Sequence, residues 1–268
     1  DEGPRDASTV VLLHGFPGSS ADWRGVLPRL TPTHRVVTLD LPGYGFSGKP
    51  PTGDYSLFRQ ADVVEGVLAG HGVERCTLVA HDMGDTVAAE LMARAHPAVR
   101  DVVLTNGSIF IDQASLTRGQ RLLLRLPRRA LPFAPPGVVL RRSLAESFAD
   151  TAPAPPGVVD DLVAMVRRRG GDRLLPLLIG YIGERREHQD RWTAALVDHP
   201  GRLTALWGGQ DPIAVTGMVR HLAALRPDVA VRVFDHLGHW PSLEAPDELA
   251  DALLAVLADG TSDPDLLQ

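Results

Sequence analysis

Residues 77–85 form an apolar strand that passes directly into a helix through a very tight turn. Asp82 stands at the apex, with Ala80 two residues before it and Gly84 two residues after it. Such a turn requires small residues at these two positions, because the chain crowds itself there. The apex side chain then projects above the sheet, toward the N–H groups of the following helix. We therefore predict that Asp82 is displayed at a site; the alternative is that it only caps the next helix.

An aspartate at this apex points to a particular chemistry. A carboxylate with a reference pKa of ~3.9 is already ionised at neutral pH, so it needs no base before it attacks. Its natural target is an electrophilic sp3 carbon, and the product of that attack is an alkyl ester of Asp82. A second step must hydrolyse the ester, so we expect a histidine-activated water and an oxyanion site elsewhere in the chain.

Length and composition exclude several classes of protein. A chain of 268 residues can form one large α/β domain, alone or with an inserted lid. Its net charge of -6 argues against a nucleic-acid partner. The single cysteine, Cys76, excludes a disulfide framework and indicates a reducing compartment. We find no signal peptide and no apolar run that could span a membrane, so we expect a soluble, cytoplasmic protein.

Short apolar segments alternate with helical patterns on both sides of the tight turn. The predicted strands are residues 9–13, 35–39, 76–80, 99–104, 202–207 and 229–234. The predicted helices are residues 22–30, 56–71, 83–95, 215–225 and 246–257. This alternation predicts an α/β fold, with a mostly parallel sheet that is covered by helices on both faces.

The alternation stops between residues 108 and 200, where helical stretches are interrupted by prolines. We interpret this segment as an inserted helical cap, so that residues 1–107 and 201–268 form the core domain. The cap has 14 Arg against 10 Asp plus Glu, a net charge of +4. This charge could attract an anionic substrate, but arginine-rich helices more often simply face water.

The loop that follows the first predicted strand, residues 14–20, contains Gly15, Pro17 and Gly18. It can leave the backbone N–H of Phe16 free to point at a ligand. Together with the N–H of Met83, this amide would give the two converging donors that a tetrahedral oxyanion needs. The alternative is a plain Gly/Pro turn.

Four motifs along the chain resemble the α/β-hydrolase superfamily. They are His14-Gly-Phe-Pro, Ala80-His-Asp-Met-Gly, Gly208-Gly-Gln-Asp-Pro and Gly238-His-Trp-Pro. The carboxylate at the apex makes the chain similar to the epoxide hydrolase and haloalkane dehalogenase branch. Residues 40–50, 81–85 and 104–110 further resemble the mesoderm-specific-transcript-like hydrolases, a group that includes bacterial proteins.

The resemblance implies a role for each catalytic candidate. The chain order Asp82, Asp211, His239 is the nucleophile, acid, histidine order of the superfamily. Asp82 would attack carbon, His239 would deprotonate the hydrolytic water, and Asp211 would orient the imidazole. His236 is a competing base, and we expect His81 to be a packing residue.

The choice between epoxide and haloalkane depends on donors to the leaving atom. Epoxide hydrolases of this branch use two cap tyrosines, and this cap has only Tyr181, which His188 or Trp192 could assist or which could merely be core. Dehalogenases place a tryptophan directly after the attacking aspartate, where this chain has Met83, although Trp192 or Asn106 could replace it.

The resulting prediction is hydrolysis of a small, apolar epoxide to a diol without metal or organic cofactor. A haloalkane dehalogenase and a catalytically silent ligand-binding protein remain as alternatives, and the sequence predicts no oligomeric state. The family usually has an antiparallel hairpin before its first parallel strand. Only eight residues precede that strand here, so we expect either about six strands instead of eight or a missing edge that lies upstream of Asp1.

Overall fold

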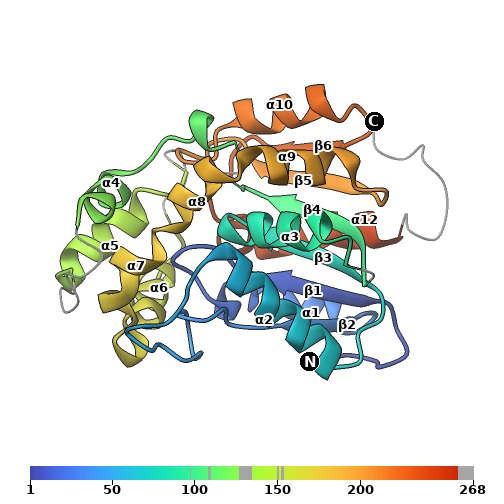
Figure 1. The fold of residues 1–268 in the computed structure, drawn as a ribbon, viewed down its shortest axis with the longest axis horizontal. Helices are drawn as coiled ribbons and strands as arrows, with labels where there is room; N and C mark the ends of the chain where they lie inside the picture. The colour runs from blue at the N-terminus through green and yellow to red at the C-terminus, as the bar shows by residue number, and fades with distance from the viewer. Residues whose placement is uncertain (97, 108–109, 127–134, 150, 152–153, 259–268) are drawn as a thin grey trace.

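The computed structural model describes residues 1–96, 98–107, 110–126, 135–149, 151 and 154–258. Its centre is one parallel sheet with the strand order β2-β1-β3-β4-β5-β6 (Figure 1). The strands are β1 (Thr9–Leu13), β2 (Arg35–Thr38), β3 (Cys76–His81), β4 (Val99–Thr105), β5 (Leu203–Gly208) and β6 (Ala230–Phe234). Each lies within two residues of its predicted position, and the predicted parallel α/β architecture is confirmed.

The register of the sheet brings several strand ends to the same edge. Leu13 of β1 lies opposite Ala80 of β3, which in turn lies opposite Leu104 of β4. The loops after these three strands therefore begin side by side. Because ligands of parallel sheets bind beyond the carboxyl ends of the strands, this edge is where a site is expected.

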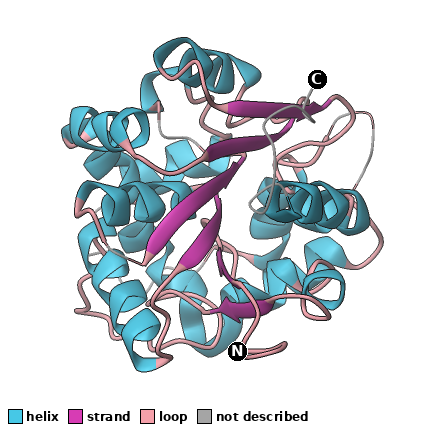
Figure 2. Ribbon diagram, turned by 90° about the vertical axis from the view of Figure 1, so that its right-hand side faces the viewer, coloured by secondary structure: helices cyan, strands magenta, loops and turns pink. Residues whose placement is uncertain are grey.

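Helices cover both faces of the sheet, which Figure 2 shows end on. One face carries α2 (Leu57–Gly70), α3 (Met83–Ala93) and α10 (Thr216–Leu225), while the other carries α1 (Leu27–Leu30) and α12 (Pro246–Ala258). Each face has its own apolar core, and the second contains Trp23 and Leu253. Burial on both faces explains why the strands are almost continuously apolar.

The predicted helix at residues 22–30 was wrong as a single element. The chain instead forms a 3-10 helix, η1 (Ser20–Trp23), and the short helix α1, with a bend between them. Gly25 lies in the bend, where a Cβ would come within 2.6 Å of the Pro246 side chain. The close approach of α12 thus explains a break that helical periodicity does not reveal. A short helix, α11 (Pro241–Glu244), was not predicted.

A helical segment connects β4 to β5. Its elements are η2 (Ile111–Gln113), α4 (Arg118–Arg125), α5 (Gly137–Ala145), α6 (Val158–Arg167), η3 (Arg168–Leu174), α7 (Leu175–Leu178), α8 (Tyr181–Glu187) and α9 (Gln189–Asp198). Helices α4 to α8 gather at one end of the sheet, whereas α9 runs back along α3 (Figure 1). We call this segment the cap; its status as a separate domain stays a prediction. Among the described residues, no helix has the length and apolar character needed to cross a membrane.

Candidate active site

The turn after β3 has the sharp geometry that the sequence predicts. Asp82 has φ 47° and ψ -109°, a strained conformation for a residue with a side chain, and is 1% exposed. The crowding comes from the end of β1 and not from Ala80. A Cβ at Gly84 would lie 2.8 Å from the His14 carbonyl oxygen, and one at Gly15 would lie 2.5 Å from the Asp82 Cβ.

The two carboxylate oxygens of Asp82 have different neighbours. The backbone N–H of Phe16 donates a hydrogen bond to Oδ2 over 3.0 Å, as expected for an oxyanion donor. On the other side, Nη1 of Arg185 lies 3.6 Å from Oδ1. Burial opposes ionisation of Asp82, but the charges of Arg185 and His239 outweigh it and lower the pKa of the carboxyl group. The role of the Met83 amide stays a prediction.

Asp211 and His239 meet beyond the ends of β5 and β6. Nδ1 of His239 lies 2.8 Å from Oδ2 of Asp211. The other carboxylate oxygen accepts hydrogen bonds from the N–H groups of Ile213 and Ala214 over 2.6 and 2.9 Å. Burial lowers the pKa of His239, but the charges of Asp211 and Asp82 outweigh this effect, so the pKa is raised. The pair can therefore stabilise a protonated imidazole.

Two other histidines were considered in the sequence. His236 lies on the surface, where its Nε2 is 3.0 Å from a carboxylate oxygen of Glu248, so it is not at Asp211. Nε2 of the buried His81 donates to the carbonyl oxygen of His239 over 2.7 Å, and burial lowers the pKa of His81 to about 4. The neutral ring of His81 thus supports the backbone that carries His239.

Asn106 contacts Asp211 directly. Its Nδ2 donates to Oδ2 of Asp211 over 2.8 Å, and its Oδ1 accepts from the N–H of Gly208 over 2.8 Å. The side chain is buried, and its hydrogen bonds orient the acid of the pair. The role of Asn106 as a substrate or halide donor stays a prediction.

Tyr181 is the cap candidate that lies beside Asp82. Its buried ring packs 5.6 Å from the ring of Phe16, the residue that donates to the nucleophile. Burial and then the negative charge of Asp82 raise the pKa of Tyr181, whereas Arg185 lowers it. Among the described residues, no hydrogen bond engages its hydroxyl group, which leaves this group available to a ligand.

Trp192 and His188 contact residues of the core helices, and their role as substrate-binding residues stays a prediction. Nε1 of Trp192 donates to Oε2 of Glu90 on α3 over 2.9 Å. The ring of His188 packs edge-on against Phe58 of α2, with ring centroids 4.9 Å apart. Both residues attach α9 and its neighbours to the core, which is a structural task that the composition of the cap did not distinguish.

Arg185 was missed in the sequence. It belongs to α8, is 0% exposed, and its Nη2 donates to the carbonyl oxygen of Asp82 over 2.7 Å. Arg185 and Tyr181 are four residues apart, so they share one face of the helix. The available signal was an arginine four residues after an aromatic residue in a helical stretch, but this spacing does not show that the shared face of the helix packs against the core.

A second buried carboxyl group lies one turn along α3. Neither oxygen of Asp85 accepts a hydrogen bond from a described residue, and burial raises the pKa of this group well above its ordinary value. Asp85 fills the space that a side chain at Gly107 would need. Among the residues placed in the structure, no cluster of His, Cys, Asp and Glu has a metal-binding arrangement.

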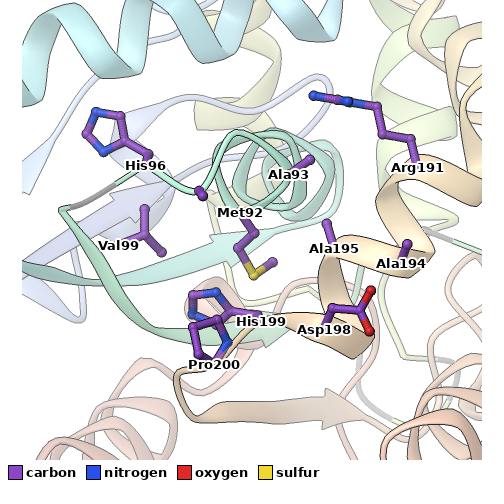
Figure 3. A pocket seen from close by; sticks show the side chains of 11 residues that line it. Met92, Ala93, His96, Val99, Arg191, Ala194, Ala195, Asp198, His199 and Pro200 are labelled. Carbon is purple, nitrogen blue, oxygen red and sulfur yellow. The ribbon is translucent and has the colours of Figure 1, made fainter.

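A cavity of about 680 Å³ lies between the end of α3 and α9 (Figure 3). His96, Arg191 and His199 line it together with apolar residues such as Met92. Arg191 is already paired with Glu90, with its Nε 2.8 Å from Oε2. None of Asp82, Asp211 and His239 lines this cavity, so it is separate from the constellation described above.

Comparisons with known proteins show the family of the chain. The family model of the alpha/beta hydrolase fold matches residues 8–246. LipZ of Mycobacterium tuberculosis, which its name describes as a hydrolase, is 39% identical over 266 residues, 96% of this chain and 91% of its own. The mesoderm-specific transcript protein of Mus musculus is 32% identical over 265 residues, covering 92% of this chain and 78% of that protein.

Solved structures also share the fold. The haloalkane dehalogenase DbeA from Bradyrhizobium elkani superposes with a TM-score of 0.80 at 23% identity, over 97% of this chain and 94% of the dehalogenase. Esterase structures are also similar, at 22% and 20% identity, so the likeness to solved structures shows the fold alone. Because the family model spans most of the sequence, the chain belongs to the alpha/beta hydrolase fold family.

Proposed function

We propose that the protein hydrolyses an epoxide to a diol through a covalent ester on Asp82. The observation that carries this proposal is the position of the carboxylate at a strained apex, with Oδ2 on the Phe16 amide and Oδ1 beside the cap. An ionised carboxylate with one oxygen bound to a backbone donor is prepared for attack by its other oxygen. The aromatic rings of Phe16 and Tyr181 favour an apolar substrate.

In the first step, Oδ1 of Asp82 forms a bond to one epoxide carbon and the bond between that carbon and the ring oxygen breaks. The ring oxygen takes a proton from the hydroxyl of Tyr181, so Asp82 becomes a neutral ester and Tyr181 a phenolate. Tyr181 suits this role because the charge of Asp82 affects its pKa and its hydroxyl group is available to a ligand. Asp82 is 1% exposed, so the reaction would take place away from bulk solvent.

In the second step, His239 removes a proton from water, which adds to the ester carbonyl. The N–H of Phe16 stabilises the oxyanion on Oδ2. When the intermediate collapses, protonated His239 gives its proton to the departing diol oxygen. The new carboxylic proton of Asp82 returns to Tyr181, which restores the starting protonation states. Asp211 stabilises the imidazolium, to which its carboxylate is already hydrogen-bonded.

Dehalogenation by the same nucleophile is the second candidate. Its support is the carboxylate itself, but a halide also needs N–H donors. Trp192 donates to Glu90 and Asn106 donates to Asp211, so the two donors considered for a halide are committed elsewhere. This difference favours the epoxide. The contact between Asp211 and His239 likewise favours turnover over a catalytically silent binding protein.

A single turnover in oxygen-18 water tests the covalent route. The enzyme is used in excess over styrene oxide and other small apolar epoxides, and the peptide that carries Asp82 is then weighed. Label in the Asp82 carboxylate is expected, because water attacks the ester carbonyl. The oxygen atom of this water then stays on Asp82, and the original ester oxygen leaves with the diol. Label in the diol with an unlabelled Asp82 would reject the covalent route in favour of direct attack by water.

A further inference from the structure

We propose that Arg185 and Asp82 act together on Tyr181, a coupling in which the positive charge of Arg185 favours proton donation by Tyr181 once alkylation removes the opposing charge of Asp82. This inference rests on the proposed function for its place in a reaction, but the coupling itself can be measured without substrate. It assigns a role to a cap arginine that lies among the reacting groups.

Arg185 is held rigidly between the nucleophile and Tyr181. Its Nε donates to Oγ1 of Thr86 over 2.7 Å, and its Nη2 donates to the carbonyl oxygen of Asp82 over 2.7 Å. Its Cζ lies 4.7 Å from the centre of the Tyr181 ring. The planar guanidinium group thus contacts the backbone of the apex and the aromatic ring at once, a geometry that suits arginine better than lysine.

A contact of the preceding residue in α8 also helps to position Arg185. Glu184, the preceding residue, accepts a hydrogen bond from the backbone N–H of Leu57 at the start of α2 over 2.7 Å. Helix α8 is therefore attached to α2 through Glu184 and to α3 through Arg185. These contacts of adjacent residues orient Arg185 toward Asp82.

The charged and titratable groups around Tyr181 make Asp82 the group that can change the balance. Asp85 interacts electrostatically with Arg185, and burial raises the pKa of its carboxyl group well above the ordinary value. Tyr44 is buried and its pKa is raised, so it stays neutral. Asp82 is ionised in the resting enzyme and offsets the positive charge of Arg185.

Alkylation removes this offset. In the resting enzyme the charge of Asp82 raises the pKa of Tyr181, while that of Arg185 lowers it. When Asp82 becomes a neutral ester, its effect on Tyr181 disappears and the effect of Arg185 remains. The pKa of Tyr181 must then fall at the point when the ring oxygen needs a proton. Hydrolysis restores the charge of Asp82, and the proton returns to Tyr181.

The coupling is tested by replacing Tyr181 with 3,5-difluorotyrosine, whose phenol ionises at lower pH and gives its own fluorine NMR signal. Asp82→Asn mimics the neutral ester without substrate. We expect this substitution to lower the pKa of the residue at 181 by about one unit or more, as for loss of a nearby like charge. The same substitution combined with Arg185→Gln should reverse most of the shift, whereas Arg186→Gln, a control on the exposed side of α8, should not.

A pKa at position 181 that Asp82→Asn leaves unchanged would overturn the coupling, and so would a shift that survives Arg185→Gln. If Arg185→Gln does not fold, Arg185→Lys replaces it. Lysine keeps the positive charge but lacks the planar guanidinium group. If the pKa of the residue at 181 stays low in the protein carrying both Asp82→Asn and Arg185→Lys, the charge is supported as the cause. A return of this pKa to its starting value refutes the charge as the cause.

Kinetics separate this inference from the proposed function. In single turnovers, Arg185→Gln should slow formation of the ester by about 10²-fold, the size expected for one lost electrostatic contact, with less effect on its hydrolysis. Equal slowing of both steps would refute a specific role in the first. If Asp82 never forms an ester with epoxides but the NMR shift is observed, the proposed reaction fails and the coupling stands.

Discussion

The two sides of Asp82 differ in how they are built. On the core side, Asp211 and His239 follow strands of one parallel sheet, and backbone N–H groups and Asn106 fix the acid in place. On the cap side, Arg185 and Tyr181 come from one short helix that is connected to the core by side-chain contacts. The core side is defined by the sheet, whereas the cap side depends on how α8 packs. We therefore expect the cap to determine the substrate and the core to determine the hydrolytic step.

Asp82→Asn should have the largest effect, since it removes the nucleophile that both sides serve. We expect turnover to fall by about 10⁴-fold or more, as for loss of a nucleophile that acts within a catalytic unit. Asparagine tolerates positive φ, so the fold should survive. Steady-state assays and thermal unfolding measure the two effects. Full activity in a preparation free of deamidation would reject Asp82 as the nucleophile.

Asn106→Gly should affect the core side alone. Glycine accepts the positive φ of residue 106, so the change removes the side-chain hydrogen bond to Asp211 without straining the backbone. We expect hydrolysis of the ester to slow by about 10- to 100-fold, as for slight misplacement of a catalytic group. Formation of the ester should change much less. Rapid-quench measurements separate the steps, and slower ester formation with normal hydrolysis would contradict the assigned role.

The pH dependence of ester hydrolysis tests the pair of Asp211 and His239, with a smaller expected effect. His239 must be neutral to accept a proton from water. In the ester, where Asp82 has lost its charge, Asp211 still raises the pKa of His239 against the effect of burial. The rate of ester hydrolysis should therefore rise with pH as the imidazolium of His239 loses its proton. Asp211→Asn removes one of the charges that raise this pKa, so the midpoint should move to lower pH. A midpoint that moves upward would contradict this electrostatic account.

Trp192→Phe should have the smallest effect on catalysis. Its indole N–H bonds to Glu90 away from Asp82, so we expect kcat and KM to change less than about twofold. The protein should lose about 1–3 kcal/mol of unfolding free energy, because a buried acceptor loses a donor. Urea denaturation measures this loss. A large fall in activity toward haloalkanes, with stability unchanged, would restore Trp192 as a halide donor.

This contrast also explains what the sequence could predict. Strand positions and the order Asp82, Asp211, His239 follow from local patterns, because a parallel sheet aligns the ends of its strands without help from distant side chains. The role of Arg185 depends on how the cap docks onto α3, which lies far away in sequence. The contact of Trp192 with Glu90 was not foreseen for the same reason, since composition does not reveal which cap side chains face the core.

The accumulation of an ester in the His239→Gln variant tests the central claim most directly. Without a base for water, the first step should proceed while the second slows by about 10²- to 10⁴-fold. After exposure to an epoxide, the mass of the peptide carrying Asp82 should increase by the mass of one intact epoxide molecule, and Asp82→Asn should abolish the increase. A variant that forms diol with no mass change on that peptide would contradict the account.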